Sequence, residues 1–167
     1  MKKFIAIMGL MLSLYTHAGD ADLADRVQDI NPKLSFQQAT EIVTVEQKYA
    51  KKYNIPVEVG LSVSAKESTF KVQARNGNSH GLKMVNYQVW HKEINVSKDC
   101  LKNIDCNTET GYKILKIYLD KSDGNMRSAL IRPGKRGLVP HYIKDKEQIR
   151  KLLYKDSGDQ YYFKKIS

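Results

Sequence analysis

The chain has 167 residues, of which 41% are hydrophobic, so it is the size of a single compact domain with an apolar core. This composition, with aromatic residues spread along the chain, excludes an intrinsically disordered protein. Its 28 Lys and Arg outnumber its 18 Asp and Glu, and the net charge of +10 favours polyanionic partners: a cell wall, an anionic lipid surface or nucleic acid.

The first 18 residues are typical of a signal peptide. Residues 1–3 are basic, residues 4–15 are almost wholly apolar, and residues 16–18 place small side chains at the two positions that a signal peptidase reads. An uncleaved membrane anchor is the alternative, but a spanning helix needs roughly 20 apolar residues. We therefore expect a periplasmic or secreted protein with a net charge of +8 after loss of Lys2 and Lys3. Such a protein meets the wall and the membrane before it meets nucleic acid.

The first clear helix signal follows a polar lead-in, residues 19–34, whose order the sequence leaves open. Ser35 and Gln38 have the spacing of a capping box, and apolar residues then recur at helical intervals as far as Tyr53. The helix is predicted to break before Pro56. This proline can open the next helix, because the N–H that it lacks would be unpaired at that position.

Residues 57–65 give conflicting signals. Apolar residues alternate there with polar or small ones, which by period alone indicates a β-strand: Val57, Val59, Leu61, Val63 and Ala65. A helix is also compatible, because Val57, Leu61 and Ala65 would then share one face. The residues themselves leave both structures open.

A loop and a long helix are predicted next. Residues 71–81 are rich in Asn and Gly, which is typical of an irregular loop or a short hairpin. Thr110 is a candidate cap for a helix that ends near residues 122–124.

The C-terminal part is predicted to hold two further helices. Residues 126–131 form a short one, stopped by Pro133-Gly134, and Pro140 begins the last one. The aromatic and basic tail, residues 156–167, is left unassigned.

Cys100 and Cys106 are the two cysteines of the chain. In an exported protein, thiols six positions apart favour a disulfide, and two buried thiols are the alternative. A zinc site built from His91 and both cysteines is disfavoured, because the spacing fits neither a deaminase nor a zinc ribbon. We therefore predict a small disulfide loop and no metal site.

Several segments, in order, resemble those of the lytic transglycosylase family. The family's Glu-Ser-x-Phe and Gly-Leu-Met-Gln segments resemble Glu67-Ser68-Thr69-Phe70 and Gly81-Leu82-Lys83-Met84. Later family segments are similar to Asn107-x-x-x-Gly111 with Leu119, to Ala129-Leu130 and to Tyr142-Ile143. The resemblance covers residues 56–153, with two departures: Lys83-Met84 replaces Met-Gln, and Pro133-Gly134 falls where the family has Tyr-Asn.

The resemblance implies the α+β class, mainly α, with a single lysozyme-like domain over residues 35–155 and a helix over residues 57–66. Glu67 would lie at the C-terminal end of that helix as the single catalytic acid/base. Most glycosidases use two carboxylates. A transglycosylase manages with one Glu, which protonates the leaving oxygen and then takes the proton from the 6-hydroxyl of the same muramic sugar. Apolar surroundings and a helix C-terminus both favour the protonated form that this chemistry needs.

The implied substrate is the glycan strand of peptidoglycan, cut at the MurNAc–GlcNAc β-1,4 bond with a 1,6-anhydro product and no cofactor. The expected substrate contacts are Ser68, Met84, Tyr87, Asn107 and Tyr142. For Asn107, a role as a cap or turn residue is nearly as well supported. Trp90 is expected in the core, and His80 is expected on an exposed loop.

Three other functions remain open at this point. A hydrolase of the same fold would need a water-positioning carboxylate, such as Asp99 or Asp105. A peptidoglycan-binding protein with weak or no turnover would serve an envelope-spanning secretion, conjugation or phage assembly. A basic binder of nucleic acid or membrane surfaces is the third, and the export signal argues against it.

Overall fold

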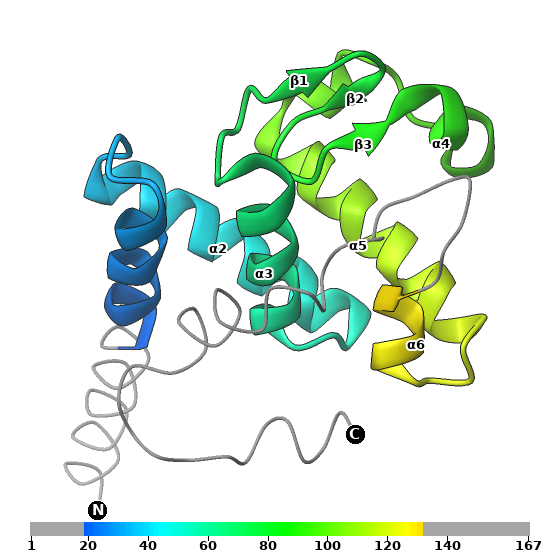
Figure 1. Ribbon diagram of the computed structural model, residues 1–167, viewed down its shortest axis with the longest axis horizontal. Coiled ribbons are helices and arrows are strands. Elements are labelled where there is room, and N and C mark those ends of the chain that lie inside the picture. Colours follow the sequence, from blue (N-terminus) through cyan, green and yellow to red (C-terminus); the bar gives the residue numbers. More distant parts are fainter. Residues whose placement is uncertain (1–18, 132–167) are drawn as a thin grey trace, which may run out of the picture.

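The computed structural model describes residues 19–131, which are mostly helical with a small three-stranded antiparallel sheet (Figure 1). This confirms the α+β, mainly α class. The lead-in segment, whose order the sequence left open, is ordered: residues 19–30 form a helix that buries Ala24 and Val27 in the core. None of the helices in this part of the chain is long and apolar enough to cross a membrane. The predicted signal peptide, the helix from Pro140, Tyr142 and the tail lie outside the described residues.

Helix α2 (Phe36–Tyr53) has the predicted boundaries. The hydroxyl oxygen of Ser35 accepts a hydrogen bond from the backbone N–H of Gln38, and the side chain of Gln38 accepts one from the backbone N–H of Ser35. This reciprocal pair is the capping box expected from the sequence. The helix ends at Asn54, which adopts the left-handed conformation with φ 52°.

Helix α3 (Val57–Ser68) resolves the conflict over residues 57–65 in favour of the helix, and Pro56 is its N-cap residue. Residues 59–64 are all buried. A helix that is buried on all sides has no polar face, so its sequence lacks the 3.6-residue pattern of an amphipathic helix. The alternation of apolar with polar or small residues, which indicated a strand, therefore does not correspond to an alternation of buried and exposed side chains.

The polar segment after α3 forms a short hairpin, one of the two structures expected for it. Strand β1 (Arg75–Asn76) pairs with β2 (Ser79–His80), and β2 pairs with β3 (Val85–Asn86), both antiparallel. Gly77 takes the hairpin turn with φ 55°, a conformation that glycine adopts at little cost. Helix α4 (Tyr87–Ile94) follows directly.

The last described elements are η1 (Cys100–Lys102), α5 (Ile104–Asp120) and α6 (Met126–Ile131). The prediction that Thr110 caps a helix was wrong. The cap is Asn103, whose side chain accepts from the N–H of Cys106, and α5 begins six residues before Thr110. Within the helix the Thr110 hydroxyl donates to the carbonyl of Cys106, one turn earlier, so its hydrogen bond is made inside α5 and not at a helix end.

Two apolar clusters form the core, and α3 contributes to both. The first gathers side chains of α2, α4 and α5 and includes Val59 and Val63 of α3. The second gathers residues 19–30, α2 and the segment after α3, and it includes Leu61 of α3. Helix α3 is thus held from two sides, which fixes the position of Glu67 in its last turn.

Candidate active site

Glu67 lies in the last turn of α3, where the helix leads into the small sheet (Figure 1). Its side chain is partly buried. Burial raises the pKa of Glu67 to about 7, and the nearby charge of Lys66 acts in the opposite direction to a smaller extent. No hydrogen bond or ion pair to the Glu67 carboxyl occurs among residues 19–131. The group is therefore a carboxylic acid that stays protonated close to neutral pH and that no described residue engages in a hydrogen bond.

The turn after Glu67 is built from two consecutive non-glycine residues with positive φ, Thr69 at 52° and Phe70 at 58°. The left-handed conformation is costly for a β-branched residue such as threonine and persists only where neighbours hold it. The side-chain amide of Asn31 donates to the carbonyl of Thr69 over 2.9 Å, and Phe70 is completely buried in the second cluster. These contacts fix the direction in which the chain leaves the catalytic candidate.

A buried ion pair, which the sequence did not predict, packs against the first and middle turns of α3. The ammonium nitrogen of Lys83 lies 2.6 Å from one carboxylate oxygen of Glu46 and 2.8 Å from the other, and neither side chain is exposed. The same ammonium group donates to the carbonyl of Gly60 in α3 over 2.6 Å. The hydroxyl of Ser64 donates to Glu46 over 2.6 Å, so the pair ties α2, α3 and the loop before β3 together.

A sequence signal for this pair exists. Glu46 falls on the buried stripe of α2, which otherwise holds small and apolar residues or Tyr: Ala39, Ile42, Val43, Tyr49 and Ala50. A carboxylate on a buried face needs a buried partner, because an unpaired charge is costly to remove from water. Lys83, which stands where the resembling family has Met, is the partner.

Two glycines make room for the pair. A Cβ atom at Gly60 would lie 2.5 Å from a carboxylate oxygen of Glu46, and one at Gly111 would lie 2.5 Å from Cγ of Lys83. The aromatic ring of Tyr112 is 5.0 Å from the Lys83 nitrogen and adds a cation–π contact. Helix α5 is thus joined to the same buried group.

Asn107 is a structural residue in this arrangement, which disagrees with its expected substrate contact. Its side chain is 1% exposed. The amide oxygen accepts from the N–H of Lys83, and the amide nitrogen donates to the carbonyls of His80 and Leu101. With these three bonds made and no exposed surface, Asn107 fastens the sheet to η1 and α5 and is not available to a ligand.

The other expected contacts differ in accessibility. Ser68 is buried and its hydroxyl donates to the carbonyl of Ser64, so it completes the end of α3. Met84 is partly exposed with φ 47°, and Tyr87 at the start of α4 is partly exposed as well. These two are the described candidates that remain open to a substrate.

His80 is not on an exposed loop, contrary to expectation. It lies in β2 with 5% of its surface exposed, and its Nε2 atom has no hydrogen-bond partner within the described part of the chain. The polar residues around it predicted a loop, but His80 pairs with Arg75 of β1 and Val85 of β3, and its side chain lies on the buried face of the sheet. Trp90, by contrast, is buried as expected and packs edge-on against Tyr118.

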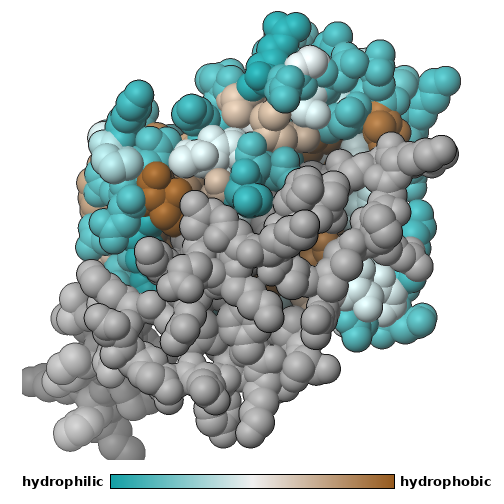
Figure 2. Space-filling model, in the orientation of Figure 1, coloured by the Kyte–Doolittle hydropathy of each residue, from teal (hydrophilic) through white to brown (hydrophobic). Residues whose placement is uncertain are grey.

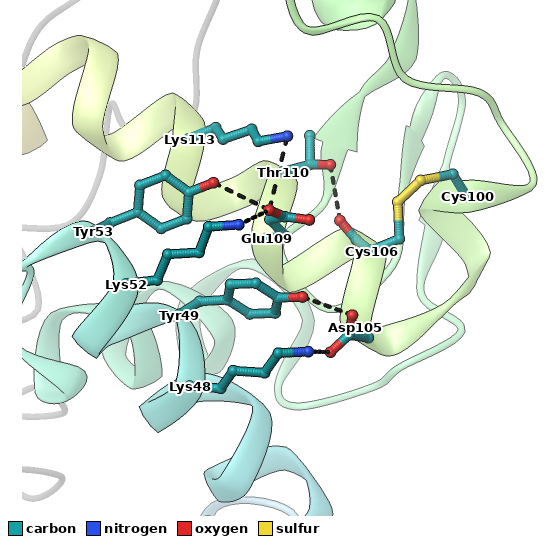
Figure 3. Close-up of polar contacts among 10 residues, drawn as sticks. All are labelled: Lys48, Tyr49, Lys52, Tyr53, Cys100, Asp105, Cys106, Glu109, Thr110 and Lys113. Carbon is teal, nitrogen blue, oxygen red and sulfur yellow. Dashed lines mark hydrogen bonds and ion pairs between the residues drawn. A yellow bond between two sulfur atoms is a disulfide. The ribbon is translucent and has the colours of Figure 1, made fainter.

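Asp99 and Asp105 are both engaged elsewhere. Asp105 accepts from Lys48 and from the hydroxyl of Tyr49 on α2, both at 2.6 Å, as Figure 3 shows. One turn further along both helices, Glu109 accepts from Lys52 and Tyr53 in the same way. Hydrogen bonds from Lys48 and Tyr49 lower the pKa of Asp105, and a bond from Lys102 lowers the pKa of Asp99.

Cys100 and Cys106 form the predicted disulfide, which joins η1 to the first turn of α5 (Figure 3). No group of three or more His, Cys, Asp or Glu residues that could hold a metal ion is found among the described residues.

Comparison with known proteins brings no assignment: no protein-family model, no curated protein and no solved structure matches the chain.

Proposed function

We propose that the protein is an exported peptidoglycan lytic transglycosylase with a lysozyme-like domain and that Glu67 is its single catalytic acid/base. The observation that carries the proposal is the state of Glu67: partly buried, unpaired among the described residues, and with a pKa raised to about 7 at the end of a firmly held helix. A general acid with a pKa near the working pH can both give and accept a proton.

The reaction needs these two transfers in sequence. The protonated Glu67 donates its proton to the glycosidic oxygen between MurNAc and GlcNAc, and the bond to the anomeric carbon of MurNAc breaks. The carboxylate then removes the proton from the 6-hydroxyl of the same MurNAc, whose oxygen bonds to the anomeric carbon and closes the 1,6-anhydro ring. The substrate's N-acetyl group stabilises the intermediate, as in other substrate-assisted glycosidases.

The environments of three other carboxylates within residues 19–131 support a mechanism with one acid. Asp99 is highly exposed and paired with Lys102, Asp105 is held by two donors from α2, and Glu46 is locked in the buried pair with Lys83. An inverting hydrolase needs a second carboxylate free to activate water across the cleft. Asp105 and Glu46 are not free in that way, and Asp99 lies on the open surface beside Lys102 with its side chain 89% exposed.

The products released from purified peptidoglycan test the proposal. Mass analysis of the sugar fragments should show anhydro-MurNAc ends, one water lighter than hydrolysed ends. Reducing ends would instead identify a lysozyme, and absence of release would identify a binding protein of the wall or of an envelope-spanning assembly.

Three variants test whether Glu67 alone acts as the catalytic acid/base. Glu67→Gln should lower turnover at least about a hundredfold, because the amide keeps its shape but transfers no proton. Asp99→Asn and Asp105→Asn should each keep most of the activity, since neither carboxylate takes part. Equal activity in wild type and Glu67→Gln would exclude the mechanism.

A further inference from the structure

The sheet, η1 and the segment just before η1 bring three positive charges together at one end of the molecule. Arg75 of β1 lies opposite His80 of β2 in the strand register. Asn107 binds the carbonyls of both His80 and Leu101, and the side chain of Gln73 binds the carbonyl of Lys102. These bonds hold η1 beside the hairpin, and the charges of Arg75, Lys98 and Lys102 all lie close enough to act on His80. We call Arg75, Lys98 and Lys102 the basic face.

The charges of the basic face are available to a ligand. Arg75 and Lys98 are exposed and have no acidic partner among residues 19–131. Lys102 pairs with Asp99, but their side chains are 61% and 89% exposed, and such a pair contributes little free energy. His80 adds no charge: burial, followed by the charges of Arg75, Lys98 and Lys102, lowers its pKa, so its imidazole is neutral at pH 7. Hydrophilic side chains dominate this end in the space-filling view (Figure 2).

An aromatic pair borders the basic face. The rings of Tyr87 and His91, one turn apart on α4, stack with centroids 4.8 Å apart, and both side chains are partly exposed. The ammonium nitrogen of Lys98 lies 5.4 Å from the centroid of the Tyr87 ring. An aromatic surface and an exposed positive charge therefore adjoin each other, an arrangement that suits recognition of an acidic sugar derivative.

We propose that Tyr87, Lys98 and Arg75 form a binding surface for a glycan strand that carries carboxylates. The C–H face of a pyranose ring packs on Tyr87, and the carboxylates of the attached stem peptides pair with Lys98 and Arg75 through charge-assisted hydrogen bonds. The choice of a wall glycan as the ligand rests on the proposed function. Single-stranded nucleic acid is a poorer fit, because such binders offer a series of aromatic rings along a charged track.

Binding can be measured without cleavage by sedimenting the full chain carrying Glu67→Gln with purified, insoluble peptidoglycan at low salt. Adding Arg75→Gln and Lys98→Gln should raise the dissociation constant about fivefold to tenfold, as expected for two exposed ion pairs. The matched control adds Lys33→Gln and Lys51→Gln, two exposed lysines outside the basic face, and should change it less than twofold. Raising the salt should remove the difference between the two double variants, because exposed charges are screened over about 10 Å at 0.1 M.

Two further arms separate the components. Peptidoglycan whose stem carboxylates have been amidated should bind the unmodified basic face as weakly as native peptidoglycan binds the Arg75→Gln/Lys98→Gln variant. Tyr87→Phe should retain binding, and Tyr87→Ala should lose it about threefold or more. Circular dichroism of each variant checks that the fold is intact.

Equal weakening by the two double variants, or unchanged binding to amidated walls, would overturn the proposal. So would tighter binding of a 20-nucleotide single-stranded DNA that depends on the same residues, since it would assign the face to phosphate polymers. The catalytic proposal fails on a different result, namely release of soluble sugar fragments by Glu67→Gln at the wild-type rate, which is read from the supernatant and not from the sedimented protein.

Discussion

Lys83 and Glu46 form an ion pair with a nitrogen–oxygen distance of 2.6 Å at a place where neither side chain reaches solvent. The ammonium group also donates to the carbonyl of Gly60. The charge of Lys83 is thus balanced by Glu46, and its hydrogen bonds are made within the protein. Removing one partner leaves the other charge buried and unpaired, whereas removing both leaves an apolar site.

We therefore expect opposite behaviour from single and double substitutions at this pair. Lys83→Met or Glu46→Gln should each lower the free energy of unfolding by about 3–5 kcal/mol. The double variant Glu46→Met/Lys83→Met should recover most of this loss, since the hydroxyl of Ser64 can then turn to the freed carbonyl of Gly60, four residues before it. Urea unfolding followed by circular dichroism measures all three, and additive losses in the double variant would contradict the interpretation.

Gly60 should not tolerate alanine, although alanine normally stabilises a helix interior by about 1 kcal/mol relative to glycine. The added methyl group would lie 2.5 Å from a carboxylate oxygen of Glu46 and against the hydroxyl of Tyr112. Overpacking of this kind should cost about 1–3 kcal/mol in thermal or urea unfolding. Combining Gly60→Ala with Tyr112→Phe, which removes the hydroxyl, should restore part of the loss; a stabilised Gly60→Ala variant would show that the site has spare room.

The raised pKa of Glu67 makes stability depend on pH. Its pKa is about 7 in the folded chain against 4.5 without the fold, so the folded state favours the protonated form. The stability from this preference is complete below about pH 4.5 and is lost as the pH rises through 7. Glu67→Gln should match the wild type at pH 4 and exceed it by about 2–3 kcal/mol above pH 7.

Unfolding of both proteins in urea between pH 4 and 8 checks this, with the difference between them as the quantity of interest. A constant difference across the range would mean that Glu67 has an ordinary pKa, and the case for it as the catalytic acid would lose its physical basis.

The Cys100–Cys106 disulfide closes a short loop, so it removes little entropy from the unfolded chain. Cys100→Ser/Cys106→Ser should cost about 2 kcal/mol, at the low end for disulfides. A reductant should lower the free energy of unfolding of the wild type by the same amount as the double substitution does. It should leave the double variant unchanged. Hydrogen exchange should quicken locally over residues 97–107, because the disulfide anchors η1 to α5; an effect spread evenly over the whole chain would argue against a local role.

The sequence by itself determined the elements whose signals are local. The capping box of Ser35 and Gln38, the Asn- and Gly-rich hairpin, the helix over residues 126–131 and the disulfide each depend on residues a few positions apart, and all were predicted and are present. Glu67 at the end of a helix was expected from the family resemblance, and its position there agrees.

Only the tertiary structure decided features that depend on distant partners. Helix α3 lacks an amphipathic pattern because neighbours bury all of residues 59–64. Asn107 has no free amide because His80, Lys83 and Leu101 use it. Glu46 and Lys83 are 37 residues apart and are tolerable inside the core only together, since each neutralises the charge that would otherwise exclude the other from a site without water.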